Sequence, residues 1–228
     1  MSAGGSIELS PTRERVVRSY YGALALLLAC TLVAQVRLSS DEGRSIVNMF
    51  SYFTIQSNVL VFVTALAVAL RPRASGVVGQ TVRLAALCGI TLTGLVYGTI
   101  IAPHVHLSGE ALVYDYVFHY VVPAAAVVGF VFVGPRTPFR TVNLVFLVWP
   151  VLWLVYTMVR GAVAEPVFRG LGEVPSHYPY HFLDVDRLPT EEVAVTIVVI
   201  ALVLVGLGFA FLHGERWLES RSVGEDVR

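Results

Sequence analysis

A dense group of polar side chains interrupts a long apolar stretch between residues 46 and 70. The segment reads Ser51-Tyr52-Phe53-Thr54-Ile55-Gln56-Ser57-Asn58 and is followed at once by an apolar run. Polar groups inside a membrane span are costly and usually face the protein interior or a cavity. With a helical turn of about 100° per residue, Ser51, Thr54 and Asn58 share one stripe, with Ser57 at its edge. A hydroxyl such as that of Thr54 becomes a nucleophile once a base removes its proton.

The base that such chemistry needs is available in His119, the histidine that lies well inside another apolar stretch. Asp115 lies four residues earlier on the same helical face, where its carboxylate would orient the imidazole. Pro123 lies four residues later and has no N–H, so the carbonyl of His119 loses a helical partner and we expect a kink there. A neutral histidine in a partly desolvated pocket is suited to general-base catalysis.

Both groups also have a purely structural interpretation. Serine, threonine and asparagine often tie membrane helices together by hydrogen bonds, and a buried histidine is often satisfied by a neighbouring helix. The density of polar residues around Thr54, and the register of Asp115, His119 and Pro123, give the functional interpretation equal weight.

The composition indicates that a membrane surrounds these residues. Hydrophobic residues make up 56% of the 228 residues and charged residues only 14%, with a mean hydropathy of +0.72. Soluble domains carry about 25% charged residues. A bilayer core of about 30 Å needs about 20 apolar residues of helix. The chain has six such stretches, near 19–36, 46–70, 84–102, 114–133, 142–159 and 193–212. They predict an all-α, polytopic membrane helical bundle of six transmembrane helices.

The arginines predict how the bundle is oriented. The two ends of the chain and the links after the second and fourth spans carry most of them: Arg13, Arg15, Arg18, Arg71, Arg73, Arg83, Arg136, Arg140, Arg216, Arg221 and Arg228. By the positive-inside rule both termini are cytoplasmic. The expected organisation is a cytoplasmic tail over 1–18, a transmembrane domain over 19–212 with an external loop at 160–192, and a cytoplasmic tail over 213–228. The chain is thus expected to be a multi-pass protein of the cell membrane.

This orientation brings the two candidate residues to a similar depth. The second and fourth spans both run from the external face inward, with Thr54 and His119 a few residues below that face. At about 1.5 Å per helical residue, their depths agree within roughly 5 Å. The two side chains are therefore predicted to meet within the bundle.

Further polar and aromatic residues are candidates for the wall or lid of a pocket. Tyr97 lies between Gly94 and Gly98, a small-residue face that permits close helix approach. The others are Trp149 and Trp153 in the fifth span, and Tyr180, His181 and Asp184 in the long external loop. Long loops often act as lids or site walls. Simple packing of the tryptophans and interfacial anchoring of the loop by its tyrosines are the alternatives.

Several classes of function lack support in the sequence. A nucleic-acid role lacks a basic patch and a domain to hold it. His104 and His106, with Glu110 nearby, do not have zinc spacing, so we expect no metal. Nucleotide-binding loops, GxSxG elbows and dinucleotide fingerprints are absent from the sequence, so we expect no cofactor.

The polar segment, the histidine and the loop together resemble a known family. The segment Tyr52-Phe53-Thr54 with its polar followers, His119 two spans later and the Tyr178-Pro179-Tyr180 loop resemble the androgen-induced-protein family, in a bacterial branch. The resemblance covers most of the helical layout and is motif-specific at 50–60, 115–123 and 178–186. It implies a multipass threonine hydrolase that cleaves fatty acid esters of hydroxy fatty acids, with Thr54 and His119 as its functional residues.

The function expected from residues and resemblance together is an integral-membrane hydrolase of fatty acyl esters. Thr54 would be the nucleophile and His119 the base. Asn58, Ser57 or a backbone N–H freed by a helix break would stabilise the oxyanion. Two alternatives stay open: an acyltransferase in which a lipid alcohol replaces water, and a small transporter or lipid-binding protein that uses the same polar cavity.

Overall fold

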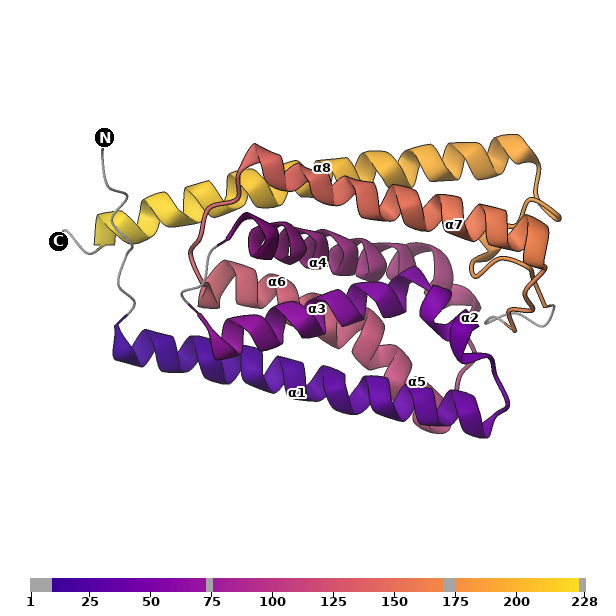
Figure 1. Ribbon diagram of the computed structural model, residues 1–228, viewed down its shortest axis with the longest axis horizontal. Coiled ribbons are helices and arrows are strands. Elements are labelled where there is room, and N and C mark those ends of the chain that lie inside the picture. The colour runs from indigo at the N-terminus through magenta and orange to yellow at the C-terminus, as the bar shows by residue number, and fades with distance from the viewer. Residues whose placement is uncertain (1–9, 73–75, 170–174, 226–228) are drawn as a thin grey trace.

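The computed structural model describes residues 10–72, 76–169 and 175–225, and these residues form a bundle of long helices (Figure 1). The α-helices are α1 (Pro11–Asp41), α2 (Ile46–Ser51), α3 (Phe53–Leu70), α4 (Val77–Val96), α5 (Gly109–Tyr116), α6 (Val122–Val128), α7 (Val148–Ala164) and α8 (Thr190–Glu225). Shorter π- and 3₁₀-helical segments extend or join them: η1 (Tyr97–Ile101), η2 (Ala102–His104), η3 (Val117–Val121), η4 (Gly129–Val133), η5 (Thr141–Leu147) and η6 (His181–Leu183).

Six of these continuous helical stretches are long and apolar enough to cross a membrane, which confirms the predicted all-α polytopic bundle. They cover Pro11–Asp41, Phe53–Leu70, Val77–Ile101, Gly109–Val133, Thr141–Ala164 and Thr190–Ser220. Most begin earlier or end later than the apolar stretches, because helices continue into the polar residues at the membrane surface. α1 starts within the predicted tail 1–18, where Ser10 caps it and Pro11 opens its first turn. The connection between α7 and α8 is correspondingly shorter than the predicted loop 160–192. Parts of the predicted tails (1–9 and 226–228) and of this loop (170–174) lie outside the described residues.

The two ends of the bundle differ. α1 begins and α8 ends at one end, here called the terminal end, as an even number of crossings requires (Figure 1). The other end, here called the loop end, holds α2 and the described parts of 165–189. α4 is the most buried of the six spans, whereas α7 and α8 expose much of their apolar surface. These exposed faces are where lipid would lie.

The second span is not one continuous helix, contrary to the expectation for 46–70. It breaks at Tyr52, whose backbone is extended (φ −68°, ψ 132°), so that α2 ends at Ser51 and α3 begins at Phe53. The indole N–H of Trp153 donates to the Ser51 carbonyl at 2.9 Å and satisfies an acceptor that the break leaves free. Thr54 is consequently the second residue of a new helix.

The fourth span contains wide π-helical turns around the predicted kink. η3 lies between α5 and α6 and includes His119, and the N–H of Val122 reaches back to the Val117 carbonyl. Pro123 follows in α6, where it is buried against Gly94 of α4. A π turn inserts one extra residue into a helix and often occurs at functional sites. Tyr97, which faces this turn from η1, also lies in a π segment.

Candidate functional site

Thr54 lies at the N-terminus of α3, where backbone N–H groups have no acceptor within the helix. Its N–H donates to the hydroxyl oxygen of Tyr180 at 3.2 Å. Its own hydroxyl, Oγ1, lies 3.3 Å from the same oxygen. Thr54 is 8% exposed. The break at Tyr52 therefore leaves a buried hydroxyl and a backbone donor outside the helical hydrogen-bond pattern, both in contact with Tyr180.

Tyr180 is the residue through which the loop between α7 and α8 reaches Thr54. Its ring packs on Phe182 with centroids 5.2 Å apart and edge-on to Tyr52 at 5.6 Å. Burial raises the pKa of Tyr180 above its usual value, and the hydrogen bonds with Thr54 partly oppose that rise. The phenol is therefore neutral at physiological pH and can both accept and donate hydrogen bonds.

His119 is held by Asp115 and Tyr97. Its Nδ1 lies 3.0 Å from Asp115 Oδ1 and 3.0 Å from the Asp115 carbonyl, four residues earlier. The Tyr97 ring stacks on the imidazole with centroids 3.7 Å apart, and its hydroxyl donates to the other carboxylate oxygen of Asp115. Asp115 is 8% exposed. Because the Asp115 carbonyl can only accept a hydrogen bond, Nδ1 carries the proton and Nε2 is left as the basic nitrogen.

Asn58 connects the two groups. This side chain is fully buried, and its amide nitrogen donates to the Thr54 carbonyl at 2.9 Å and to the Phe118 carbonyl at 3.4 Å. Phe118 directly precedes His119 in η3. The backbone of Thr54 and the π turn that carries His119 therefore approach each other at a single amide. Among the described residues, however, no hydrogen bond joins Thr54 directly to His119.

Ser57 and one atom of Asn58 are buried polar groups without a hydrogen-bond partner. The atoms are Ser57 Oγ and Asn58 Oδ1. Ser57 points at α4, because a Cβ placed on Gly89 would lie 3.0 Å from its hydroxyl oxygen. Of the predicted oxyanion donors, the backbone N–H of Thr54 contacts the same Tyr180 oxygen as the Thr54 hydroxyl. Buried unpaired polar atoms are uncommon in folded proteins and often mark sites of function.

The two tryptophans predicted to line a pocket pack around the start of α3. Trp149 stacks on Phe53 at 4.8 Å and donates to Gln56 Oε1 at 3.1 Å. Trp153 lies edge-on to Phe53 at 5.1 Å and 6.1 Å from the Tyr180 ring. α7 thus supplies an aromatic wall beside the helix break.

The other two predicted loop residues take different positions from Tyr180. Asp184 is 2% exposed and accepts hydrogen bonds from Ser176 Oγ at 2.7 Å and from the Asp186 N–H at 3.1 Å. These contacts hold the loop in its own conformation. His181 is exposed and lies edge-on to Phe182. Tyr180 is the predicted loop residue that contacts Thr54.

Sequence reasoning missed a second polar group that surrounds Ser51. Ser51 Oγ lies 3.0 Å from the Tyr156 hydroxyl and 3.2 Å from an Arg160 nitrogen, and Arg160 also donates to Asn48 Oδ1 at 2.6 Å. The available signal was an arginine at the end of the apolar fifth span, where a charge needs polar partners.

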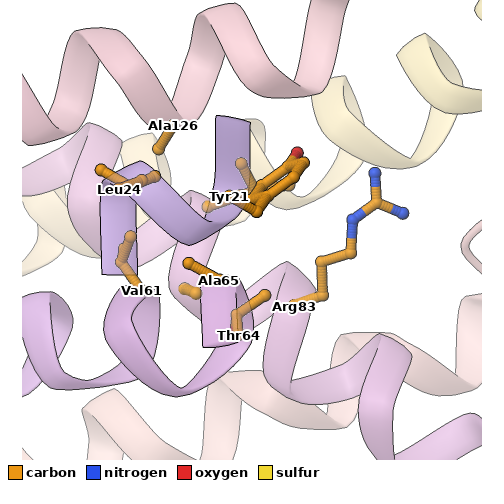
Figure 2. A pocket seen from close by; sticks show the side chains of 9 residues that line it. Tyr21, Leu24, Val61, Thr64, Ala65, Arg83 and Ala126 are labelled. Carbon is orange, nitrogen blue, oxygen red and sulfur yellow. The ribbon is translucent and has the colours of Figure 1, made fainter. Parts of the chain in front are cut away.

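A small cavity of about 20 Å³ lies two to three turns further along α3, next to Val61 and Ala65 (Figure 2). Its lining includes Tyr21, Thr64 and the stem of Arg83. A volume of this size holds about one water molecule, so the cavity is not a lipid pocket. Within the part of the chain that the structure describes, no group of three metal-binding side chains occurs.

Comparisons with known proteins returned nothing: no protein-family profile, no curated protein and no solved structure matches this chain.

Proposed function

We propose that this protein is an integral-membrane hydrolase of fatty acyl esters, with Thr54 as nucleophile and His119 as general base. The observation that carries the proposal is the pair of hydrogen bonds from Asn58, which link the backbone of Thr54 to the residue before His119. The start of α3, which carries Thr54, and the turn η3, which carries His119, are thereby joined at one amide. The resemblance to membrane threonine hydrolases gives the same two residues.

The reaction starts when the Thr54 hydroxyl exchanges its contact with Tyr180 for His119 Nε2. The imidazole takes the hydroxyl proton while Oγ1 attacks the ester carbonyl. Asp115 keeps the opposite nitrogen protonated and stabilises the imidazolium that forms. His119 then returns the proton to the departing alcohol, which leaves an acyl-threonine. Water, activated by the same nitrogen, releases the fatty acid and restores Thr54.

The N-terminus of α3 would stabilise the negative charge on the tetrahedral intermediate. The N–H of Thr54 donates to the Tyr180 hydroxyl oxygen at 3.2 Å. In the proposed reaction the oxyanion would take the place of this oxygen. Backbone donors and the positive end of the helix dipole both favour an anion there. If the substrate carbonyl displaces Tyr180, the Thr54 N–H exchanges a neutral phenol oxygen for an oxygen that becomes negatively charged in the tetrahedral intermediate. The N–H binds this charged oxygen more tightly.

A site at this depth suits an ester of a fatty acid. Each methylene moved from water into the bilayer contributes about 0.8 kcal/mol, so long acyl esters concentrate in the membrane. The break between α2 and α3 lies near the loop end of the bundle (Figure 1). The substrate would arrive through lipid and the water from the loop end.

The experiment is ester turnover by purified variants in neutral detergent. We expect Thr54→Ala and His119→Ala each to lower kcat by about a thousandfold or more, because each removes a member of one catalytic unit. Thr31→Ala is the matched control. Thr31 is also a buried threonine within a span, but its hydroxyl bonds the Leu27 carbonyl of its own helix. Normal turnover by both folded site variants would refute the proposal.

A fluorophosphonate probe and an acceptor alcohol refine the same test. Labelling at Thr54 in the wild type, lost in His119→Ala, supports a nucleophilic threonine activated by the histidine. Products formed with and without a lipid alcohol distinguish hydrolysis from acyl transfer.

One observation favours a second candidate, a lipid-binding or transport protein. The recorded contact of Thr54 Oγ1 is Tyr180 rather than His119, as expected if the polar groups only hold the loop and a ligand in place. Such a protein would be stabilised by a fatty acyl ester without turning it over or reacting with the probe.

A further inference from the structure

A closed pocket at the loop end, without room for a water molecule between its side chains, lies between the end of α7, α2 and the loop that follows α7. Its lining combines polar side chains with rings and prolines: Ser51, Tyr156, Thr157, Arg160, Pro166, Phe168 and Pro179. None of these residues is used in the proposed hydrolysis. The pocket nevertheless adjoins the site, since Ser51 is the residue before the break at Tyr52.

Arg160 contributes a positive charge to this pocket without a carboxylate partner. Its recorded hydrogen bonds go to neutral oxygens, Asn48 Oδ1 at 2.6 Å and Ser51 Oγ at 3.2 Å. Its guanidinium also lies 5.6 Å from the centre of the Phe168 ring. Among the described residues, Arg160 has no ion pair, whereas Arg18, Arg37, Arg44, Arg83 and Arg187 each have one. A half-buried cation without a counterion favours the binding of an anion.

Thr157 adds a second, independent indication of a ligand. This residue is 4% exposed and lines the same pocket one turn before Arg160. Its Oγ1 is buried and has no hydrogen-bond partner, although a helical threonine can bond the carbonyl four residues earlier. Rearrangement of the lining side chains, which is common on binding, would expose this hydroxyl in the same pocket as the uncompensated guanidinium, and the two together match the needs of an oxyanion.

The surroundings indicate that this anion is attached to an apolar chain. α7 exposes an apolar stripe that leads to the pocket, with Leu152, Val155 and Val159 each more than half exposed. Tyr156, which is 43% exposed, lies between this stripe and Arg160. A chain lying along the stripe would bring its headgroup to the end of α7, where arginine commonly meets the membrane surface.

We propose that Arg160 and Thr157 form a binding site for the anionic headgroup, carboxylate or phosphate, of a single-chain lipid that lies along α7. Arg160 supplies the charge and Thr157 a hydroxyl donor. Pro166 and Phe168 exclude water from one side. Binding does not require turnover, so the site stands independently of the proposed hydrolysis.

The test is thermal unfolding of the full-length protein in neutral maltoside detergent with four added probes. Dodecanoate and dodecyl phosphate are expected to raise Tm by about 5 °C at saturation, and dodecanol and acetate to leave it unchanged. Equal stabilisation by dodecanoate and dodecanol would overturn the site. Equal stabilisation by acetate would overturn its assignment to a lipid.

Variants assign the effect to the two residues. Arg160→Gln is expected to weaken dodecanoate binding roughly tenfold to a hundredfold and remove its advantage over dodecanol. Thr157→Val should weaken it less. Arg37→Gln is the matched control, because it removes the same charge from a residue whose side chain is 83% exposed near the end of α1. An unchanged preference for dodecanoate in Arg160→Gln would refute the assignment.

Two further measurements keep the test decisive. If Arg160→Gln does not fold, a diazirine fatty acid is crosslinked to the wild type. We expect it to label the α7 peptide that contains Arg160 and to be displaced by dodecanoate but not by dodecanol; labelling elsewhere would refute the site. Thr54→Ala separates the two proposals, since it should lose ester turnover and keep the preference for dodecanoate.

Discussion

Asp115 is the side chain on which the chemistry of His119 depends most directly. One carboxylate oxygen holds the imidazole at 3.0 Å and the other accepts the Tyr97 hydroxyl. The Asp115 carbonyl also lies 3.0 Å from Nδ1 and keeps the proton there, but an amide of the same shape carries no negative charge to stabilise the imidazolium. In the proposed mechanism the base therefore needs this carboxylate.

We expect Asp115→Asn to lower kcat by about a hundredfold or more and to leave KM within a fewfold, because the stabilisation of the imidazolium rather than a substrate contact is lost. Steady-state kinetics on a fatty acyl ester measure both. Glu110→Gln is the control, since Glu110 pairs with Tyr114 on the exposed surface of the same helix. A rise in KM with normal kcat would contradict the role assigned to Asp115.

The contacts that the sequence predicted are those between residues close together in one helix. Asp115 and His119 are four residues apart, so their pairing follows from helical geometry alone. The stack of Tyr97 on His119 and the contact of Tyr180 with Thr54 join residues from different spans. No periodicity encodes such pairs, because they depend on how helices pack and where a loop folds back. The direct contact expected between Thr54 and His119 stays a prediction.

The helices themselves were predicted better than their interruptions. Apolar length identified all six spans, since a bilayer demands about 20 apolar residues of helix. The break at Tyr52 and the π turns at Tyr97 and His119 leave no mark on hydropathy. These interruptions depend on contacts with other helices. The Trp153 indole N–H donates to the Ser51 carbonyl at the break, and Pro123 packs on Gly94 beside the π turn. These interruptions are what aim the candidate residues into the bundle.

Gly94 controls how closely α4 approaches the turn that carries His119. A Cβ at this position would lie 3.0 Å from Pro123 Cβ and 3.4 Å from the His119 carbonyl oxygen. We expect Gly94→Ala to destabilise the fold by about 1–3 kcal/mol, because it pushes two packed backbones apart. It should also lower kcat by displacing His119 from Asn58 and Thr54.

Gly98→Ala provides the comparison on the same span, since nothing lies within 4 Å of a Cβ there. It should leave both the unfolding free energy and kcat close to wild type. Unfolding in mixed detergent and sodium dodecyl sulfate micelles, followed by tryptophan fluorescence, gives the first quantity and ester turnover the second. Equal effects of the two substitutions would show that the approach of α4 does not position His119.

The molecule as a whole has two polar ends with different structural roles. At the loop end, hydroxyl, amide and imidazole groups include unpaired buried atoms beside the helix break. At the terminal end, Arg83 of α4 and Glu215 of α8 form an almost fully buried ion pair at 3.6 Å. Glu215 also accepts the Thr137 N–H at 2.9 Å, and Arg83 lies 4.9 Å from the centre of the Phe139 ring. This network joins α4, α8 and the link between the fourth and fifth spans.

The buried pair should stabilise the bundle only while both partners are present. Glu215→Gln leaves the Arg83 guanidinium, drawn in Figure 2, without its counterion, and we expect a loss of about 3–5 kcal/mol of unfolding free energy. Replacing both residues (Arg83→Met with Glu215→Leu) should recover most of that loss, because apolar side chains of similar volume avoid the desolvation of two charges.

Glu14→Gln, in the more exposed pair with Arg18, should cost less than about 1 kcal/mol and is the control. The same mixed-micelle unfolding measures all three variants. Ester turnover by the folded double variant should match wild type, since the pair lies at the opposite end of the bundle from Thr54. A double variant as unstable as Glu215→Gln would mean that the charges themselves, rather than their mutual compensation, hold α8 against α4.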